Sequence, residues 1–558
     1  MTHTVDPPER TRHDPGRRAR RRAAPAVRRH RVYFGLIGLA VLAVLVLVPV
    51  LPSTPHAPGP SPTPVAAVPP GVTPPTPAYG TGTTVGGVRC GPGRRQVTWS
   101  VYAPACQPAW HGRNGGATSL GVTGSTITVA YRVAPVSQLM AQYPFLPAGI
   151  LGLPAQEVAT IDAYLAVFNR DFELYGRRVV LVPYGGTSDL LDGGPAGDAR
   201  DATYVATTLR AFADLSLGDS GPIYTADLTA RHVVSLDVEA TTEAAYAAAS
   251  PYQYSPGPNC TKGATATAAV LGRQLAGLDA ARAGDADLTA SVRRYGMLFA
   301  DSTTGAGCSQ AVEDDLAADH VAVHPVFAVA TDLDHMAASA QAALLELRAD
   351  RVTTVICSSC DPVMTLLAMR AADRLGYHPE WWLESDLAGG QTDTDALTRE
   401  LPADQADHAI STGTPAGPAG SQEARRVLGL ARPTPAAGPT VALIYQALLQ
   451  LFDGLQLAGP DLTPAGLLSA MGRIPVSGPG GMFGPWRGRA GPYDPAAGFT
   501  VVAWDAATTS PSDGRTGAWV ACDGGRTFAY PTAGRAVPAR TPLECRPGTG
   551  RPDPGRGR

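Results

Sequence analysis

The chain contains 558 residues, of which 44% are hydrophobic and 17% are charged, and its formal net charge is −3. The first 31 residues hold ten arginines and three acidic residues, so this arm carries +7 (10 − 3) and the remainder carries −10 (−3 − 7). Such a length allows several domains, and the acidic remainder would repel phosphate groups, which argues against nucleic-acid binding.

An uncharged apolar run follows this basic arm. Residues 32–51 read VYFGLIGLAVLAVLVLVPVL, and a helix of this length at ~1.5 Å per residue spans the ~30 Å hydrocarbon core of a membrane. A cleaved signal sequence is the alternative, but its apolar region is usually only ~7–15 residues long. We therefore predict a retained single-pass membrane helix, with the arm 1–31 in the cytoplasm and the body outside the cell.

Residues 52–80 are rich in proline, which favours an extended, semi-rigid linker. The next segment, 81–121, carries two of the eight cysteines and is predicted to be a small disulfide-stapled lead-in ahead of the main domain. The other six cysteines lie further along the chain. All eight are therefore on the side of the membrane where disulfides persist. Many pairings are possible; proximity along the chain favours Cys90–Cys106, Cys260–Cys308, Cys357–Cys360 and Cys522–Cys545.

Strand and helix patterns alternate from residue 126 onward. The apolar runs 126–133 and 177–185 are typical of buried strands, and between them apolar residues recur at helical spacing from Val158 to Phe172. The pattern next predicts a helix at 199–213, a short strand to 217, a helix at 221–231 and a strand at 233–238. This order indicates a first α/β unit with a parallel sheet.

The second half of the chain repeats this rhythm. Strands are predicted at 295–301, 321–329, 352–357 and 380–383, and helices at 308–319, 333–350, 361–377 and 440–457. Strand-like sequence after 485 leads into a Pro/Gly/Arg-rich end that we predict to be disordered. In parallel α/β sheets, ligands bind outside the carboxyl ends of the strands.

The ordered set of these segments resembles the type I periplasmic-binding fold, and specifically the branched-chain amino-acid (Leu/Ile/Val) type substrate-binding proteins of ABC transporters. GVTGSTITVAYRV is similar to the opening strand of that family, RRYGMLFADSTTGAG to the strand and loop that open its second lobe, and TVALIYQALLQLFDGLQLAG to its late helix. The resemblance covers residues 124 to about 505. It implies an α/β protein of two Rossmann-like lobes joined by a hinge, behind the single N-terminal membrane helix.

The resemblance also implies domain boundaries. The two-lobed domain is expected at 122–505, with the first lobe at about 122–255 plus part of 405–460. The second lobe is expected at about 290–400 plus part of 460–505. Residues 506–558 are then a separate strand-like segment and a disordered tail.

In the resembled family, an amino acid lies between the lobes, where hydroxyls and helix-end amides hold its carboxylate and an acidic residue holds its ammonium. Carried over by position, these contacts fall on seven residues: Ser220, Thr241 and Thr242 in the first lobe, and Thr304, Ser358, Ser359 and Asp386 in the second. Asp386 matches the acidic position, although a solvated loop aspartate is equally compatible with the sequence. Thr304 departs from the aromatic residue that is frequent there, so a branched-chain ligand is not implied.

Two stretches suggest enzymes instead. GDSGP (218–222) is similar to the stretch around the nucleophile of chymotrypsin-like proteases, but it lacks the second glycine and the sequence offers no His partner with catalytic context. Ser220 is therefore interpreted as a ligand contact or a helix cap. Cys357-Ser-Ser-Cys360 before a predicted helix is compatible with a thiol-disulfide oxidoreductase, since a helix N-terminus lowers a thiol pKa. Outside the cell, a structural disulfide is favoured.

We therefore predict a membrane-anchored extracellular solute-binding protein that takes a small polar ligand, such as an amino acid, and delivers it to an ABC permease. No catalysis, cofactor, metal site or nucleic-acid partner is predicted. A ligand-sensing or scaffold ectodomain of the same fold is the alternative, and the oxidoreductase is the third.

Overall fold

The computed structural model describes residues 80–133, 144, 154–187, 195–215, 221–236, 241–384, 394–413, 420–438, 440–477, 484, 486, 493–511 and 513–545. All of them belong to one compact unit, residues 76–558. The predicted basic arm, the membrane helix 32–51, and the linker 52–80 apart from Gly80 lie outside the described residues.

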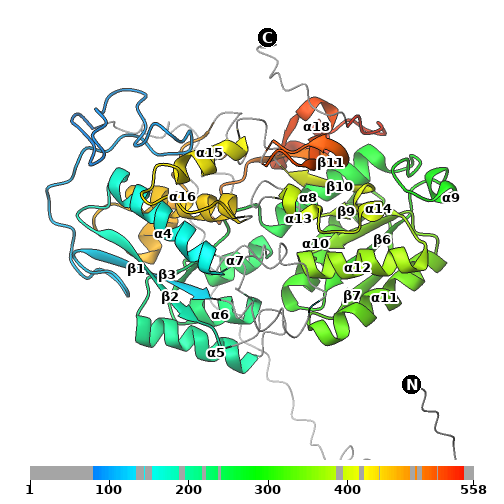
Figure 1. Cartoon of the computed structure of the whole chain (residues 1–558), viewed down its shortest axis with the longest axis horizontal. Coiled ribbons are helices and arrows are strands. Elements are labelled where there is room, and N and C mark those ends of the chain that lie inside the picture. The colour runs from blue at the N-terminus through cyan, green and yellow to red at the C-terminus, as the bar shows by residue number, and fades with distance from the viewer. Residues whose placement is uncertain are drawn as a thin grey trace, which may run out of the picture. The chain divides into compact units, whose positions relative to one another are not determined.

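The first lobe contains a five-stranded sheet in the order β2-β1-β3-β4-β5. Figure 1 shows β1, β2 and β3 of this sheet close together. Every pairing in it is parallel. Side chains of β1 alternate between two cores, with Ile127 and Val129 on one face and Ala130 on the other. The strands are β1 (Thr126–Val133), β2 (Arg178–Gly185), β3 (Ala213–Asp214), β4 (Val234–Leu236) and β5 (Gln253–Tyr254).

The helices of this lobe come from two distant parts of the chain. They are α4 (Pro154–Asp171), α5 (Pro195–Tyr204) with its π-helical extension η1 (Val205–Leu209), α6 (Pro222–Ala230), α7 (Glu243–Ala249), α15 (Gly420–Leu428), α16 (Val441–Ala458) and α17 (Pro464–Met471). Among the described residues, α16 is the one helix long and apolar enough to cross a membrane, and 89% of it is buried inside the fold.

The second lobe contains an eight-stranded sheet, in which β12-β11-β10-β9-β8-β6-β7 lie side by side and β13 pairs with β11. The strands β10, β9, β8, β6 and β7 are parallel, and β11 runs antiparallel to its neighbours β10, β12 and β13. Their bounds are β6 (Tyr295–Ala300), β7 (Val323–Val329), β8 (Thr354–Ser358), β9 (Glu380–Leu383), β10 (Ala409–Gly413), β11 (Gly498–Thr509), β12 (Thr516–Ala521) and β13 (Thr527–Ala529).

Local sequence signals explain where the helices of the second lobe begin and end. Asp361 caps α12 by accepting from the amides of Val363 and Met364, and Gly376 ends it at φ +58°, a conformation that favours glycine. The helices are α8 (Cys260–Thr267) with its π-helical extension η2 (Ala268–Leu275), α9 (Ala286–Thr289), α10 (Thr303–Ala318), α11 (Leu333–Ala349), α12 (Pro362–Leu375), α13 (Thr394–Thr398), α14 (Ala403–Ala406) and α18 (Ala533–Ala536).

Several predicted boundaries need correction, among them the start of the helix predicted at 308–319, which begins at Thr303. The helix expected at 199–213 ends at Leu209, because Arg210 takes a left-handed backbone conformation (φ +51°) and the chain then enters β3. The second lobe begins at α8 instead of residue 290, since α8 packs against α10. It also continues past 505, because β12 and β13 complete its sheet.

The segment 81–121 is part of the first lobe and not a separate module. Trp99 stacks on Phe168 of α4 with ring centroids 5.2 Å apart, and its indole NH donates to Asp171 at 3.1 Å. The Gln96 side-chain amide donates to the backbone carbonyl of Asp171 at 3.0 Å. The aromatic contacts place this segment over the C-terminal end of α4.

Two of the segments that pass between the lobes are joined by a buried ion pair. Lys262, the one lysine in the sequence, donates from Nζ to Asp494 Oδ1 at 2.5 Å and to the Ala496 carbonyl at 2.9 Å. Asn259 Nδ2 donates to the other oxygen of Asp494 at 2.9 Å. Burial raises the pKa of Asp494, and the Lys262 ammonium opposes that shift. This pairing holds the connections β5–α8 and α17–β11 together.

Asp453 on α16 is fully buried, and neither of its carboxylate oxygens has a hydrogen-bond partner among the described residues. Burial raises its pKa well above the usual range, and Arg95 partly opposes this. The folded protein therefore retains a proton that the unfolded chain releases. This protonation contributes to the free energy of unfolding in full below the pKa that Asp453 has in the unfolded chain. The contribution is lost as pH rises through the higher pKa that Asp453 has in the folded protein.

We expect the Asp453→Asn variant to exceed the parent chain in free energy of unfolding by about 1–3 kcal/mol at mildly alkaline pH, because its folding no longer requires the uptake of a proton by an ionised carboxylate. Urea unfolding at a series of pH values measures this, with the difference vanishing in acid. Equal stability of the two chains at every pH would contradict the protonated state of Asp453.

Candidate ligand-binding site

On the first lobe, the described part of the candidate site is the start of α7. Thr242 caps this helix, its hydroxyl accepting from the Ala245 amide at 3.2 Å. Thr241 is buried, and its carbonyl accepts from the Cys260 amide at 3.1 Å. The Thr242 hydroxyl thus has a structural role that the sequence did not indicate. Ser220, the third predicted residue of this lobe, lies outside the described residues.

On the second lobe, the start of α10 follows β6 directly. Ser302 caps α10 by accepting from the Gly305 amide at 2.9 Å, and the predicted Thr304 lies half-buried in the first turn. The cap was missed from the sequence, although Ser at this position before a helix is a recognised signal.

The serines of the Cys-Ser-Ser-Cys stretch occupy different environments. Ser358 ends β8 with 0% of its surface exposed, and its hydroxyl has no hydrogen-bond partner within the described parts of the chain. Ser359 takes φ +52° and donates its amide to Glu384 Oε2 at 2.9 Å. A buried hydroxyl without a partner is uncommon, and it leaves Ser358 able to bond to a ligand.

Glu384 lies beside the Cys-Ser-Ser-Cys stretch and was not among the residues predicted from the sequence. It directly follows β9, and the register of β8 and β9 pairs Cys357 with Leu383, which brings Ser359 and Glu384 together. The alternation of strands and connections could have pointed to Glu384 as the first residue beyond a strand. Asp386 lies outside the described residues.

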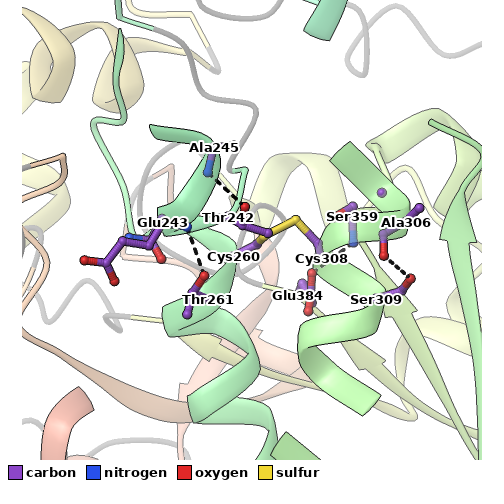
Figure 2. The surroundings of a disulfide bond; sticks show 12 residues. Thr242, Glu243, Ala245, Cys260, Thr261, Ala306, Cys308, Ser309, Ser359 and Glu384 are labelled. Carbon is purple, nitrogen blue, oxygen red and sulfur yellow. Dashed lines mark hydrogen bonds between the residues drawn. A yellow bond between two sulfur atoms is a disulfide. The ribbon is translucent and has the colours of Figure 1, made fainter. Parts of the chain in front are cut away.

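A disulfide lies where the two lobes make contact. Cys260, the first residue of α8, is bonded to Cys308 of α10, and the Glu243 amide of α7 donates to the Thr261 hydroxyl at 3.0 Å. A Cβ added to Gly307 would lie 3.4 Å from Thr242 Cγ2, so α7 and α10 are in close approach. Figure 2 shows Thr242, Ser359 and Glu384 in the surroundings of this disulfide.

A buried ionic network lies at the carboxyl ends of β1 to β3 in the first lobe. Arg132 contacts Asp198 at 2.9 Å and Asp201 at 3.1 Å, and all three side chains are at most 4% exposed. The guanidinium carbon lies 4.5 Å from the centre of the Tyr224 ring, whose hydroxyl donates to Asp214 at 2.9 Å. Burial raises the Tyr224 pKa, so this hydroxyl stays protonated.

This network was not predicted from the sequence. Its signal was an arginine inside the apolar strand TITVAYRV, followed in the chain by aspartates three positions apart, Asp198 and Asp201. Side chains at that spacing share one face of a helix. A Cβ at Gly186 would lie 2.8 Å from Arg132 Nε, so a larger residue there would displace the guanidinium.

All four disulfides favoured from proximity are present in the structure. Cys357 and Cys360 are 1% and 7% exposed, and reactive redox cysteines need access to a partner thiol.

We expect titration of the native chain with a thiol reagent to detect no free thiol, and mild reductant to leave Cys357–Cys360 intact. Selective reduction of this pair in the folded protein would instead favour the oxidoreductase hypothesis.

Among the described residues, no group of three or more His, Cys, Asp or Glu is arranged to hold a metal ion. His320 and His324, which share strand-like sequence, do not form such a group. His320 precedes β7 with a left-handed backbone (φ +60°), and His324 is the second residue of that strand.

Comparison with known proteins places the fold in a class. No protein-family model matches the chain, and no curated protein sequence matches it significantly. The two-lobed architecture with parallel sheets is the type I periplasmic-binding fold of ABC-transporter substrate-binding proteins.

Two solved structures represent this similarity. A fatty acid ABC transporter substrate-binding protein from Thermomonospora curvata superposes with a TM-score of 0.51 at 12% identity, over 76% of this chain and 97% of that one. A leucine-, isoleucine-, valine-, threonine- and alanine-binding protein from Brucella ovis also gives 0.51, at 14% identity over 74% and 98%. Both are named as binding proteins and not as enzymes. Identities this low establish the fold and not the ligand.

Proposed function

We propose that the chain is a membrane-anchored extracellular solute-binding protein that captures a small polar molecule between its lobes for ABC-type uptake. The observation that carries this proposal is the buried, unpartnered Ser358 hydroxyl at the carboxyl end of β8. It lies beside Ser359 and Glu384, at the edge where parallel α/β sheets receive ligands.

Each lobe contributes a different kind of group. The second lobe supplies the Ser358 hydroxyl, the Glu384 carboxylate and the amino end of α10, whose amides favour an acceptor. The first lobe supplies the start of α7, with buried Thr241. The buried pair of Lys262 and Asp494 holds two interlobe connections together, so closure of the lobes would bend the chain around this pair.

The sequence supports the proposed anchoring and location. The apolar run 32–51 would span the bilayer, and the proline-rich residues 52–80 would hold the binding domain away from it. Four disulfides in the described residues suit an oxidising, extracellular compartment.

Thermal unfolding of the full-length chain in detergent tests ligand capture. Amino acids, amines, amides, small peptides and organic acids would be added one at a time. A ligand at 100 times its Kd stabilises the folded state by ~2.7 kcal/mol, which raises the melting temperature measurably. No shift with any compound would contradict solute capture and favour the scaffold or sensor alternative.

Ser358→Ala sharpens this test. Because the Ser358 hydroxyl has no partner in the described residues, its removal is expected to leave the ligand-free melting temperature unchanged and to weaken the ligand by about tenfold, one lost hydrogen bond. Ser309→Ala is the matched control, since that buried hydroxyl donates to the Ala306 carbonyl within α10. Equal ligand affinity in the parent and Ser358→Ala chains would remove Ser358 from the site.

A further inference from the structure

The part of the fold that directly follows the predicted linker is basic, although the rest of the body is acidic. Residues 80–121 contain four arginines and no aspartate or glutamate, a charge of +4. Because the chain after residue 31 carries −10, its remaining part carries −14 (−10 − 4). Figure 1 shows this segment, in blue, on the outside of the first lobe. Its charge is therefore opposite to that of the body on which it packs.

The arginines of this segment and of the end of α15 face solvent. Arg89, Arg94 and Arg113 are exposed, and among the described residues their side chains form no ion pair or hydrogen bond. Arg426 and Arg432 are also exposed, and their guanidinium groups donate to backbone carbonyls. Bonds to neutral carbonyls do not cancel the positive charge. We call the exposed residues of 80–121 and 426–432 the basic surface.

The carboxylates near the basic surface already interact within the protein. Asp171, at the end of α4, accepts from an indole NH at 3.1 Å and from a guanidinium group at 2.7 Å. Glu173 and Glu423 are buried, and each accepts hydrogen bonds of 2.6 to 2.9 Å. Asp461 is exposed, but it interacts with the guanidinium group of Arg177. An excess of positive charge therefore remains on the surface.

Large apolar side chains are exposed among these arginines. The described residues expose nine such side chains, and four of them belong to the basic surface: Val85 (47%), Val101 (44%), Trp110 (38%) and Leu430 (39%). Single exposed apolar residues are normal on any protein. Their concentration beside unpaired arginines is instead typical of a surface that meets a partner.

Two of these apolar residues lie close to the end of α4. A Cβ added to Gly86, the neighbour of Val85, would lie 3.1 Å from Asp171 Oδ1. The Trp110 amide donates to Glu173 Oε2 at 2.9 Å, two residues further along the chain than Asp171. Both ends of the segment therefore approach the same turn of the first lobe.

The other two lie on either side of a contact between the segment and α15. The Trp99 carbonyl accepts from Arg426 at 3.2 Å, and the Trp99 indole NH donates to Asp171. Val101 is two residues beyond Trp99, and Leu430 is four residues beyond Arg426. The four apolar side chains and the arginines between them thus gather in one region of the first lobe.

A bilayer that contains anionic lipid matches this combination. Arginines are attracted to anionic headgroups, tryptophan is favoured at membrane–water interfaces, and aliphatic side chains beside basic ones enter the headgroup region. The linker 52–80 joins the predicted span 32–51 directly to the basic surface, so the bilayer is at high local concentration.

We propose that the basic surface docks on the anionic lipid surface of the membrane in which the chain is anchored. This docking holds the first lobe against the bilayer, where a permease would receive the ligand. The inference rests on the proposed anchoring and goes beyond solute capture.

Energy transfer from tryptophan to dansyl-labelled headgroups tests the docking. The full-length chain is inserted into nanodiscs of phosphatidylcholine, either alone or mixed with phosphatidylglycerol. We expect stronger transfer in the anionic discs, and a decrease as salt is added, since screening weakens charge attraction. Trp110→Phe should remove a large part of the difference between the two kinds of disc, because Trp110 is exposed on the basic surface.

Two triple variants with the same change in charge locate the docking. One combines Arg89→Gln, Arg94→Gln and Arg113→Gln, and its transfer in anionic discs should fall to the level in neutral discs. Each arginine near an anionic surface changes the affinity about fivefold, so three change it about 100-fold. The control makes the same substitution at three exposed arginines of the second lobe: Arg348, Arg351 and Arg374. The control should behave as the parent chain does, and both variants should keep the parent melting temperature.

The outcomes separate the docking from the proposed anchoring and from solute capture. Equal transfer by the parent chain in neutral and anionic discs overturns the docking and leaves a protein partner as the occupant of the basic surface. An equal loss in both triple variants, or no loss in either, overturns the assignment to this surface. A chain that leaves the discs once detergent is removed overturns the anchoring, and the inference with it. Solute capture is tested separately, by the melting shift with ligand.

Discussion

Replacing Arg132 by methionine is expected to lower the free energy of unfolding by about 3–5 kcal/mol. The guanidinium contacts Asp198 at 2.9 Å and Asp201 at 3.1 Å, and none of the three side chains is more than 4% exposed. Without the arginine, two carboxylates remain buried without their cation, and burying an unpaired charge is among the most costly changes in a protein interior. Urea unfolding followed by circular dichroism measures the loss.

A control variant and a compensating variant distinguish the loss of the buried ionic network from a general effect of removing an arginine. Arg231 contacts Asp227 at 3.0 Å on the surface of α6, with both side chains about one-third exposed, so Arg231→Met should cost about 0.3–0.5 kcal/mol. Combining Arg132→Met with Asp198→Asn and Asp201→Asn removes the buried charges and should recover most of the stability. A loss in Arg132→Met no larger than in Arg231→Met would show that the network is not formed.

Removing the Cys260–Cys308 disulfide by a double serine substitution is expected to cost about 4 kcal/mol, the chain-entropy estimate for a loop of this size. The two cysteines are 48 residues apart in the sequence, so the bond strongly restricts the unfolded chain. It also fixes the start of α8, which the Thr241 carbonyl contacts, to α10. Guanidinium unfolding of the variant under non-reducing conditions tests this.

The matched control is the Cys357–Cys360 pair, which closes a loop with a sequence separation of only 3. Its double serine variant loses far less unfolded-state restriction, so its stability should fall by clearly less. If both variants lost equal stability, the cost would come from the folded state and not from loop closure. Ligand affinity in the Cys260/Cys308 variant then reports whether α7 and α10 still approach one another.

Periodicity and capping made the central part of the fold predictable from the sequence. The run 126–133 forms β1 with the predicted bounds, and Asp361-Pro362 begins α12 as expected. These signals are local, since alternation of side chains and satisfaction of the first amides of a helix depend on residues a few positions apart. The helix expected at 199–213 was wrong at its end, because the left-handed Arg210 leaves no mark on apolar periodicity.

The candidate site was less predictable. Position alone pointed to Thr242, but the structure uses its hydroxyl as a helix cap. It pointed to Asp386, which lies outside the described residues, and it did not point to Glu384, which accepts from the Ser359 amide. A choice between carboxylates two residues apart depends on where the strand ends and on its register with the neighbouring strand, and neither is readable to that accuracy from periodicity.

The sequence by itself determined the alternation of strands and helices, because that alternation is written in the local order of apolar and polar residues. Only the tertiary structure decided that Arg132 is neutralised by Asp198 and Asp201, that Lys262 joins two interlobe connections through Asp494, and that β12 and β13 complete the second sheet. These contacts join residues tens to hundreds of positions apart, and their energy comes from burial, which exists only once the chain has folded.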